Sequence, residues 1–222
     1  MMIDTNNVSI ESLRKAYDFR SSAYDKTVAI SELEYHKKAL DKIQWHSHLK
    51  ILEVATGPGR VLLEIAKRTG NAEPIYGIEL SKRMLELAEK RMVQNGYENI
   101  VLKQGDCRHL PWTDNSFDIL YNGYMMDLIP ADDMQDILKE MYRVLKPGGK
   151  LIMVNMSKNE ESNSSFLEHL YQFLPKLLVL YIMGNCRPVL MKEPVSIAGF
   201  VNIAREYHHG KHPTEIIIAN KE

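Results

Sequence analysis

Hydrophobic and polar positions change their spacing along the chain. Over residues 9–43 the apolar positions recur with a helical period, and Ser31 followed by Glu34 has the spacing of a capping box. This part of the chain predicts two helices. From residue 50 on, short apolar runs alternate with amphipathic stretches, which predicts strands at 51–55, 75–79, 99–103, 117–121 and 150–155.

The stretches between these runs have the pattern of helices. One helix begins at Arg60, a second is capped by Ser81, and a third covers 132–145 before a turn at 146–149. Strands that alternate with helices of this length predict an α/β fold, in which a parallel sheet carries helices on both faces.

The last part of the chain departs from this alternation. Residues 162–183 predict a helix broken at Pro175. The runs at 200–207 and 215–219 predict two strands, and the seven residues between them are too few for a crossover helix. We therefore expect seven strands, mostly parallel, with a C-terminal antiparallel hairpin at one edge.

Composition and charge narrow the function classes. Apolar residues make up 45% and charged residues 26% of the 222 residues, as in an ordinary globular protein. Lys plus Arg is 28 and Asp plus Glu is 29, and this balance argues against a nucleic-acid partner. Two cysteines, Cys107 and Cys186, make no disulfide framework, which favours a cytoplasmic location.

No targeting or membrane-spanning segment is expected. The first seven residues, MMIDTNN, contain no apolar core of a signal peptide. The longest apolar stretch, 173–183, is short and is interrupted by Pro175 and Lys176. Contact with a membrane surface and the formation of a homodimer stay open.

A glycine turn carries the main chemical signal. Residues 51–60, ILEVATGPGR, have the pattern of a strand, a tight turn and a helix start, with Gly57 and Gly59 where backbone approaches a ligand. Glu79 follows Gly59 by 20 positions, which suits a carboxylate that binds ribose hydroxyls. Leu62 stands where a dinucleotide site needs a third glycine, and the chain has no Gly-Lys-Ser/Thr. Both observations favour a nucleoside without a pyrophosphate and disfavour an oxidoreductase.

With these motifs the chain resembles the class I S-adenosylmethionine-dependent methyltransferases, most closely the ubiquinone/menaquinone biosynthesis group. The family pattern E/D-x-G-x-G-x-G appears as residues 53–59 with Ala55 in place of the first glycine. Residues 105–112, 115–118 and 144–149 match further motifs in the family's order. The resemblance implies a Rossmann-like doubly wound sheet, S-adenosyl-L-methionine as cofactor and S-adenosyl-L-homocysteine as product.

The resemblance also implies roles for single residues. Glu53 anchors the methionine amino group, Asp106 takes the exocyclic amine of adenine, and the Cys107 N–H faces the ring. Tyr17 and Tyr24 are lid candidates, of which Tyr24 is the better match; an aromatic ring suits a sulfonium. The expected cofactor-binding residues are Tyr24, Glu53, Ala55, Gly57, Gly59, Glu79, Leu80, Asp106, Cys107 and Asn122. No metal site is expected at His208, His209 and His212, which lack a Cys or acidic partner with suitable spacing.

Methyl transfer from a sulfonium needs no obligatory catalytic residue, and none is assigned. Tyr24, Asn122, Tyr124 and Asp127 are candidates near the path of the methyl group. We expect one domain over 1–222, made of a helical lid (1–48), a cofactor-binding core (49–156), an acceptor-side helical insert (157–198) and the hairpin (199–222).

The acceptor is the open part of the hypothesis. The insert is rich in apolar residues, which favours a wall for a small lipophilic acceptor, either quinone- or isoprenoid-like or a lipid head group. Packing of this stretch on the core, on a membrane or on a second subunit is the alternative. A methyltransferase-like module that binds the cofactor without turnover, and a protein or nucleic-acid methyltransferase, are the competing functions.

Overall fold

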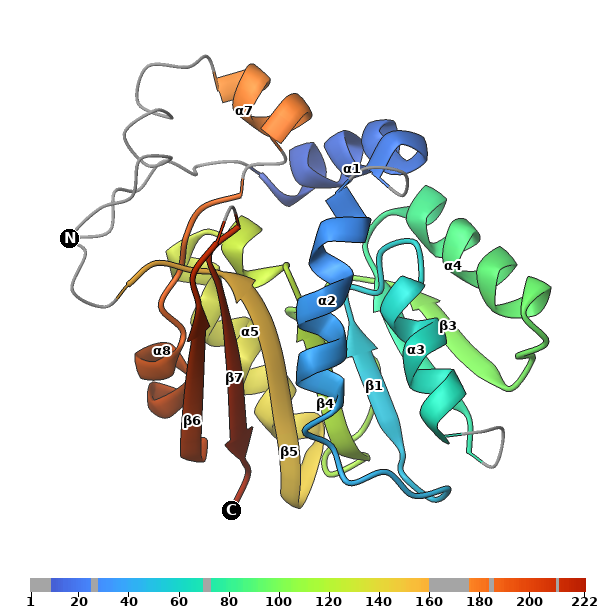
Figure 1. Cartoon of the computed structure of the whole chain (residues 1–222), viewed down its shortest axis with the longest axis vertical. Helices are drawn as coiled ribbons and strands as arrows, with labels where there is room; N and C mark the ends of the chain where they lie inside the picture. Colours follow the sequence, from blue (N-terminus) through green and yellow to red (C-terminus); the bar gives the residue numbers. More distant parts are fainter. Residues whose placement is uncertain (1–8, 25–27, 70–72, 160–175, 184–185, 211) are drawn as a thin grey trace.

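The computed structural model describes residues 9–24, 28–69, 73–159, 176–183, 186–210 and 212–222. Seven strands form one sheet in the order β3-β2-β1-β4-β5-β7-β6 (Figure 1). Its strands are β1 (Ile51–Val54), β2 (Ile75–Glu79), β3 (Ile100–Gln104), β4 (Phe117–Gly123), β5 (Leu145–Met156), β6 (Val201–His208) and β7 (Thr214–Asn220). β1 to β5 pair in parallel, and β7 is antiparallel to both β5 and β6. The predicted mostly parallel sheet with a C-terminal hairpin is confirmed.

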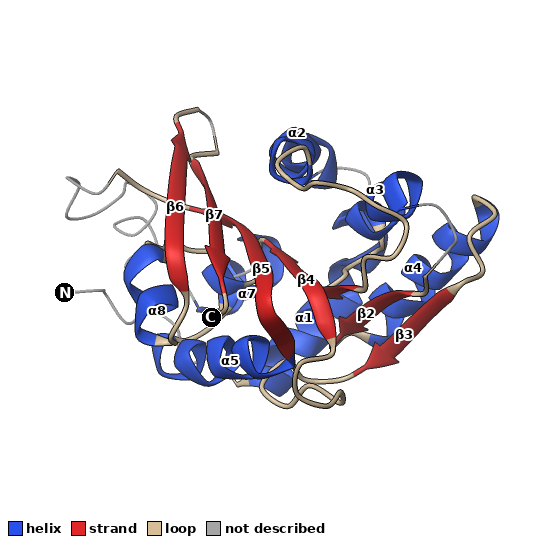
Figure 2. Ribbon diagram, turned by 90° about the horizontal axis from the view of Figure 1, so that it is seen from below, coloured by secondary structure: helices blue, strands red, loops and turns tan. Residues whose placement is uncertain are grey.

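Helices cover both faces of the sheet, as Figure 2 shows. One face packs against α2 (Val28–Leu40), α3 (Arg60–Thr69) and α4 (Lys82–Gln94), which bury the side chains Leu40, Leu62 and Met92. The other face packs against α5 (Ala131–Val144) and α8 (Lys192–Ile197). Each helix buries an apolar stripe on the sheet, so the fold has three layers.

Two helices lie beyond the carboxyl ends of the parallel strands. α1 (Ile10–Tyr24) and α7 (Lys176–Met183) sit above this edge in Figure 1, and Leu13, Ala16 and Leu180 pack between them. The Ser81 hydroxyl, at the N-cap of α4, donates to Oδ1 of Asp18 in α1 at 2.5 Å. This bond fastens α1 across the end of β2.

The register aligns the ends of three neighbouring strands. Val54 of β1 pairs with Ile78 of β2 on one side and with Asn122 of β4 on the other. The loops that leave these strands therefore meet at one place, where open α/β sheets bind ligands.

One local prediction is wrong, and two short helices were missed. The turn expected at 146–149 lies inside β5, which begins at Leu145 and contains Gly148 at φ +77°. The pairing with β4 shifts there, so the extra residues form an irregularity in a continuous strand. The short helix Met126–Leu128 (η1) and α8 were not predicted at all.

The helix expected at 162–183 is described only over α7, because residues 160–175 lie outside the described part of the chain. Within the described residues, no helix has the length and apolar character needed to cross a membrane. The four-part division of the chain stays a prediction.

Candidate functional site

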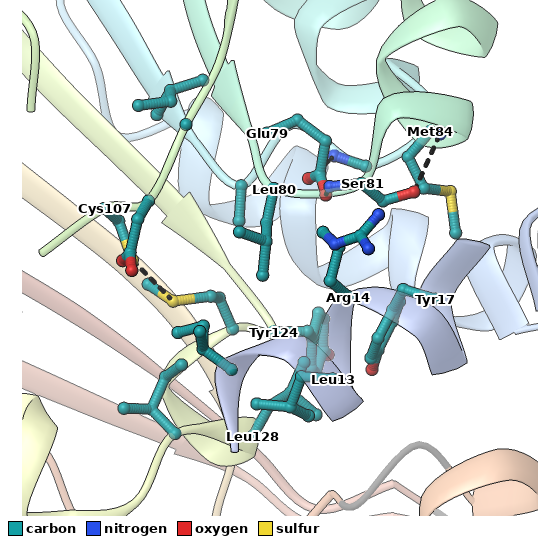
Figure 3. Close-up of a pocket in the computed structure, with 18 of the residues that line it drawn as sticks. Leu13, Arg14, Tyr17, Glu79, Leu80, Ser81, Met84, Cys107, Tyr124 and Leu128 are labelled. Carbon is teal, nitrogen blue, oxygen red and sulfur yellow. Dashed lines mark hydrogen bonds between the residues drawn. The ribbon is translucent and has the colours of Figure 1, made fainter. Parts of the chain in front are cut away.

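A cavity opens at the carboxyl ends of β1, β2 and β4, below α1 (Figure 3). It encloses about 810 Å³ of space, including its open mouth. One end is formed by polar groups on the loops after β2 and β3, and the other by apolar side chains after β4. The lining residues that matter below are Arg14, Tyr17, Ala55, Gly57, Glu79, Leu80, Asp106, Cys107, Gly123, Tyr124, Met125, Leu128 and Ile129.

The glycine turn forms the floor of this cavity. Ala55, Gly57 and Gly59 all have positive φ, at +60°, +51° and +77°. Glycine adopts this backbone freely, whereas alanine pays about 1–2 kcal/mol. A Cβ on Gly59 would lie 2.7 Å from the Cα of Ala88 in α4, but a Cβ on Gly57 would meet nothing within 4 Å. Gly59 therefore serves helix packing, and Gly57 leaves backbone open to a ligand.

Glu79 ends β2 and is oriented by two backbone donors. The Gly57 N–H donates to one carboxylate oxygen at 2.9 Å, and the Ser81 N–H donates to the other at 2.8 Å. The side chain is buried, and burial raises the pKa of this carboxyl while the backbone donors oppose the rise. A carboxylate has more acceptor sites than these two donors fill, so it can also accept from a ligand hydroxyl.

A second, smaller hollow borders the first. Ala55, Gly57 and Gly123 line both, and the second is also lined by Glu32, His36, Glu53, Thr56 and Arg60. Glu53 is buried, and its Oε2 and the Thr56 hydroxyl lack a hydrogen-bond partner within the described residues. Burial, with a smaller contribution from the charge of Glu79, raises the pKa of Glu53 well above its ordinary value. An ammonium group in this hollow would satisfy the carboxylate.

Asp106 and Cys107 form the wall opposite Glu79. The Arg108 guanidinium donates two hydrogen bonds to Oδ2 of Asp106, at 3.0 Å and 2.7 Å. Burial acts to raise the pKa of Asp106, but these bonds to Arg108 outweigh it and hold the pKa below its usual range. Burial raises the pKa of Cys107 to about 12, so this side chain is a neutral thiol.

The apolar end of the cavity follows β4. Tyr124 has φ +48°, which is strained for an aromatic residue, and its hydroxyl lies 2.9 Å from the Thr214 hydroxyl. Met125, Leu128 and Ile129 complete this wall. The tight turn after β4 thus presents apolar side chains to the cavity close to the glycine turn.

The structure brings together most of the expected cofactor-binding residues. Ala55, Gly57, Glu79, Leu80, Asp106 and Cys107 line the main cavity, Glu53 lines the neighbouring hollow, and Gly59 packs behind the turn. Asn122 lies differently: it is fully buried, its Nδ2 donates to the Val54 carbonyl at 2.9 Å, and it is not part of either lining. Tyr24 ends α1, and its side chain lies outside the described part of the chain.

Three α1 residues were not expected among the lining residues. Ile10, Leu13 and Arg14 line the cavity together with Tyr17, which was a lid candidate. Their spacing of three, four and seven places them on one helix face, and this pattern was the available signal. The sequence gives the face of the helix, but it does not say which surface that face covers.

Comparison with known proteins gives one family and several relatives. Residues 45–183 match the model of a methyltransferase domain. The ubiquinone/menaquinone biosynthesis C-methyltransferase of Geotalea daltonii is 32% identical over 180 residues, which cover 79% of this chain and 74% of that protein. A demethylmenaquinone methyltransferase of Lactobacillus johnsonii is 38% identical over 125 residues, or 56% of this chain. The chain spans about half of that relative and 63% of a similar one from Anoxybacillus flavithermus.

Solved structures share the fold. An S-adenosylmethionine-dependent methyltransferase of Thermotoga maritima superimposes with a TM-score of 0.68 at 21% sequence identity. The match covers 95% of this chain and the whole of that one. The similarity therefore extends over nearly the whole fold.

Proposed function

Because the chain belongs to the S-adenosylmethionine-dependent methyltransferases of the ubiquinone/menaquinone biosynthesis type, we propose that it methylates a small lipophilic acceptor of the quinol class. The observation that carries the proposal is the buried Glu79 carboxylate, which is bonded to the glycine turn and lies in the wall of an otherwise largely apolar cavity. Such a carboxylate, at the end of the second strand, suits the two hydroxyls of a ribose.

The cofactor fits the polar groups of both hollows. Glu79 would hold the ribose, while Asp106 and the backbone N–H of Cys107 would contact the adenine. Gly57 and Gly123 border both hollows, so the methionine part would pass between them and place its ammonium near the unpaired oxygen of Glu53. The burial of Glu53, and the lack of a hydrogen-bond partner for its Oε2 among the described residues, support this assignment independently of the family.

The acceptor would occupy the apolar end. This end is lined by residues that follow β4 and by two residues of α1: Tyr124, Met125, Leu128 and Ile129, with Leu13 and Tyr17. A flat aromatic acceptor with an isoprenoid tail matches this lining better than a charged substrate does. The relatives that carry menaquinone or ubiquinone in their names support the same class.

The protein contributes mainly position and the exclusion of water. The bound sulfonium supplies an activated methyl group. Glu79, Asp106 and the turn fix the cofactor end, and the apolar wall holds the acceptor in line with it. Alignment of this kind removes a large part of the entropic barrier.

The test is calorimetric titration with S-adenosylmethionine and S-adenosylhomocysteine. We expect micromolar binding of both, lost in Glu79→Ala and unchanged in Glu86→Ala, whose side chain is 62% exposed on α4. Failure of the unaltered protein to bind either nucleoside would contradict the proposal.

Turnover is tested separately with a prenylated 1,4-naphthohydroquinone that is unsubstituted next to the prenyl group, kept reduced in the assay. Formation of the ring-methylated product supports the acceptor class. Tight binding of the nucleoside without methylation of any quinol would instead support the cofactor-binding module without turnover.

A further inference from the structure

Asp127 is an unexplained buried carboxylate beside the acceptor end of the cavity. It lies in η1 and is 1% exposed, and neither carboxylate oxygen has a hydrogen-bond partner within the described residues. An ionised carboxylate without partners is costly in a protein interior. A buried carboxyl group such as that of Asp127 is therefore able to gain or lose a proton.

Its surroundings come from four elements. Tyr17 of α1, Tyr124 after β4, Cys186 and Arg187 after α7, and Glu215 of β7 are its electrostatic neighbours. Burial raises the pKa of Asp127 to about 7, although the Arg187 guanidinium and the Cys186 thiol act against the rise. Tyr17, Tyr124 and Cys186 are themselves held neutral, since burial raises the pKa of each.

The position of Asp127 is fixed on both sides. The Arg187 N–H donates to the Asp127 carbonyl at 2.9 Å, and the Arg187 guanidinium donates to the Ile129 carbonyl at 2.5 Å. The flanking residues Met125, Leu128 and Ile129 line the cavity. Asp127 therefore belongs to the same short segment as three residues of the wall against which the acceptor would rest.

Three other buried groups are poorer proton acceptors for this step. Burial lowers the pKa of His36 to about 3, and its Nδ1 is already bonded to the Tyr121 hydroxyl at 2.7 Å. Cys107 is a thiol with a pKa near 12. Glu53 lines the second hollow, where the methionine ammonium would bind.

We propose that Asp127 is the general base that takes the hydroxyl proton of the acceptor. The inference rests on the proposed function and names a residue for its chemical step. Tyr17 lines the cavity and is an electrostatic neighbour of Asp127, so we propose that the acceptor displaces this side chain to reach the carboxylate.

The step balances for a quinol. The O–H bond breaks, the proton goes to Asp127, and the electron pair stays on oxygen and delocalises into the ring. The ring carbon then bonds to the methyl group, and the electron pair of the broken carbon–sulfur bond goes to sulfur, leaving a neutral thioether. The hydrogen on the attacked carbon leaves as a proton to solvent, and Asp127 returns its proton to the oxygen. The net release is one proton, as the reaction of a sulfonium with a neutral phenol requires.

The kinetic test compares Asp127→Asn with Asp136→Asn, which removes a 69% exposed carboxylate from α5. With the naphthohydroquinone probe, we expect kcat of the unaltered protein to rise with pH through about 7. Asp127→Asn should lower kcat about 10²- to 10⁴-fold and should abolish the rise of kcat with pH. Its affinity for S-adenosylmethionine should stay unchanged. Asp136→Asn should keep both the rate and the pH profile. A kcat of Asp127→Asn within threefold of the unaltered protein, or the same rise with pH, would overturn the assignment.

A second measurement needs no turnover. In protein labelled with ¹³C at the aspartate carboxyl carbons, the signal missing from Asp127→Asn should titrate near pH 7. In the presence of S-adenosylhomocysteine, it should shift when 2-naphthol is added as a phenol probe. A signal that titrates near pH 4, or that does not shift when 2-naphthol is added, would contradict the proposal. If S-adenosylhomocysteine itself fails to bind, the proposed function has failed instead.

Discussion

Two buried carboxylates at the same end of the sheet differ in their partners. Glu79 accepts one backbone N–H on each oxygen, whereas Asp127 accepts none within the described residues. Hydrogen bonds from backbone donors stabilise a charged carboxylate, so Glu79 can be buried at a moderate cost. For Asp127 burial outweighs the opposing Arg187 and Cys186, so the folded protein favours the neutral form, and this couples the proton to the stability of the fold.

The first prediction concerns this coupling. The folded pKa of Asp127 is about 7, above the ordinary value of 3.8, so the folded state binds the proton more tightly than the unfolded chain does. The contribution of this proton to the free energy of unfolding is fully present below pH 4 and is lost as the pH rises through 7. At about 1.4 kcal/mol per pKa unit, Asp127→Asn should gain about 2–3 kcal/mol over the unaltered protein between pH 5 and pH 8.

Urea unfolding at pH 5, 6, 7 and 8 measures this difference. Asp136→Asn is the control, since its side chain is 69% exposed and should show a difference that stays flat with pH. A gain for Asp127→Asn that does not change with pH would mean that the carboxylate stays charged when the protein folds.

The glycine turn links β1, α3 and α4, and its two glycines do different work at the scale of elements. Gly59 lets the start of α3 approach α4, where an added Cβ would be 2.8 Å from the Ala88 Cβ. Gly57 touches no such neighbour and lines both hollows. Ala55 already has φ +60°, so the turn tolerates a Cβ in a left-handed position.

The second prediction separates these roles. Gly59→Ala should destabilise the protein by about 2–4 kcal/mol, from overpacking against α4 plus backbone strain. Gly57→Ala should cost only about 1–2 kcal/mol but should weaken S-adenosylhomocysteine binding at least tenfold, because its methyl group enters ligand space. Chemical unfolding and calorimetry on both variants measure this. If both variants lost the same affinity and had the same stability, the two glycines would not have the different roles assigned to them.

The elements of the core were accessible to sequence reasoning because each rests on local rules. The run ILEVATGPGR and the 20-residue spacing to Glu79 identified β1, its turn and the end of β2 without knowledge of the rest of the fold. The hairpin followed from the length of its loop. At 146–149, a local rule gave the wrong answer: Leu145 pairs with Phe117 before these residues and Lys150 pairs with Ile119 after them, so the expected turn is an irregularity inside β5.

The acceptor end of the cavity could not be predicted from the sequence, because it depends on contacts between distant segments. Asp127 was only one of several candidates near the path of the methyl group, and its electrostatic neighbours include Arg187, 60 positions later, and Glu215. The helical period of α1 is visible in the sequence, but the bond from Ser81 that fastens Asp18 is not. Asn122 was expected in the site, yet its amide bonds the Val54 carbonyl within the sheet.

At the scale of the whole molecule, the site is made by segments that leave every central strand and by a helix from the other end of the chain. α1 covers the cavity, the turn after β1 forms its floor, and the loops after β2, β3 and β4 form its walls (Figures 1 and 3). A ligand held by all of these segments binds the folded state only, so its binding energy adds to the stability of the entire fold.

The third prediction follows from that linkage. S-adenosylhomocysteine at about 100 times its dissociation constant should add about 2.7 kcal/mol to the free energy of unfolding. For a chain of 222 residues, this corresponds to a rise of about 5–11 °C in the melting temperature. NADH should give no shift, because Leu62 stands where a dinucleotide site needs glycine. Glu79→Ala should abolish the shift with S-adenosylhomocysteine while keeping a cooperative transition. A shift with NADH that exceeds the one with S-adenosylhomocysteine would reverse the choice of nucleoside, and with it the chemistry argued for this cavity.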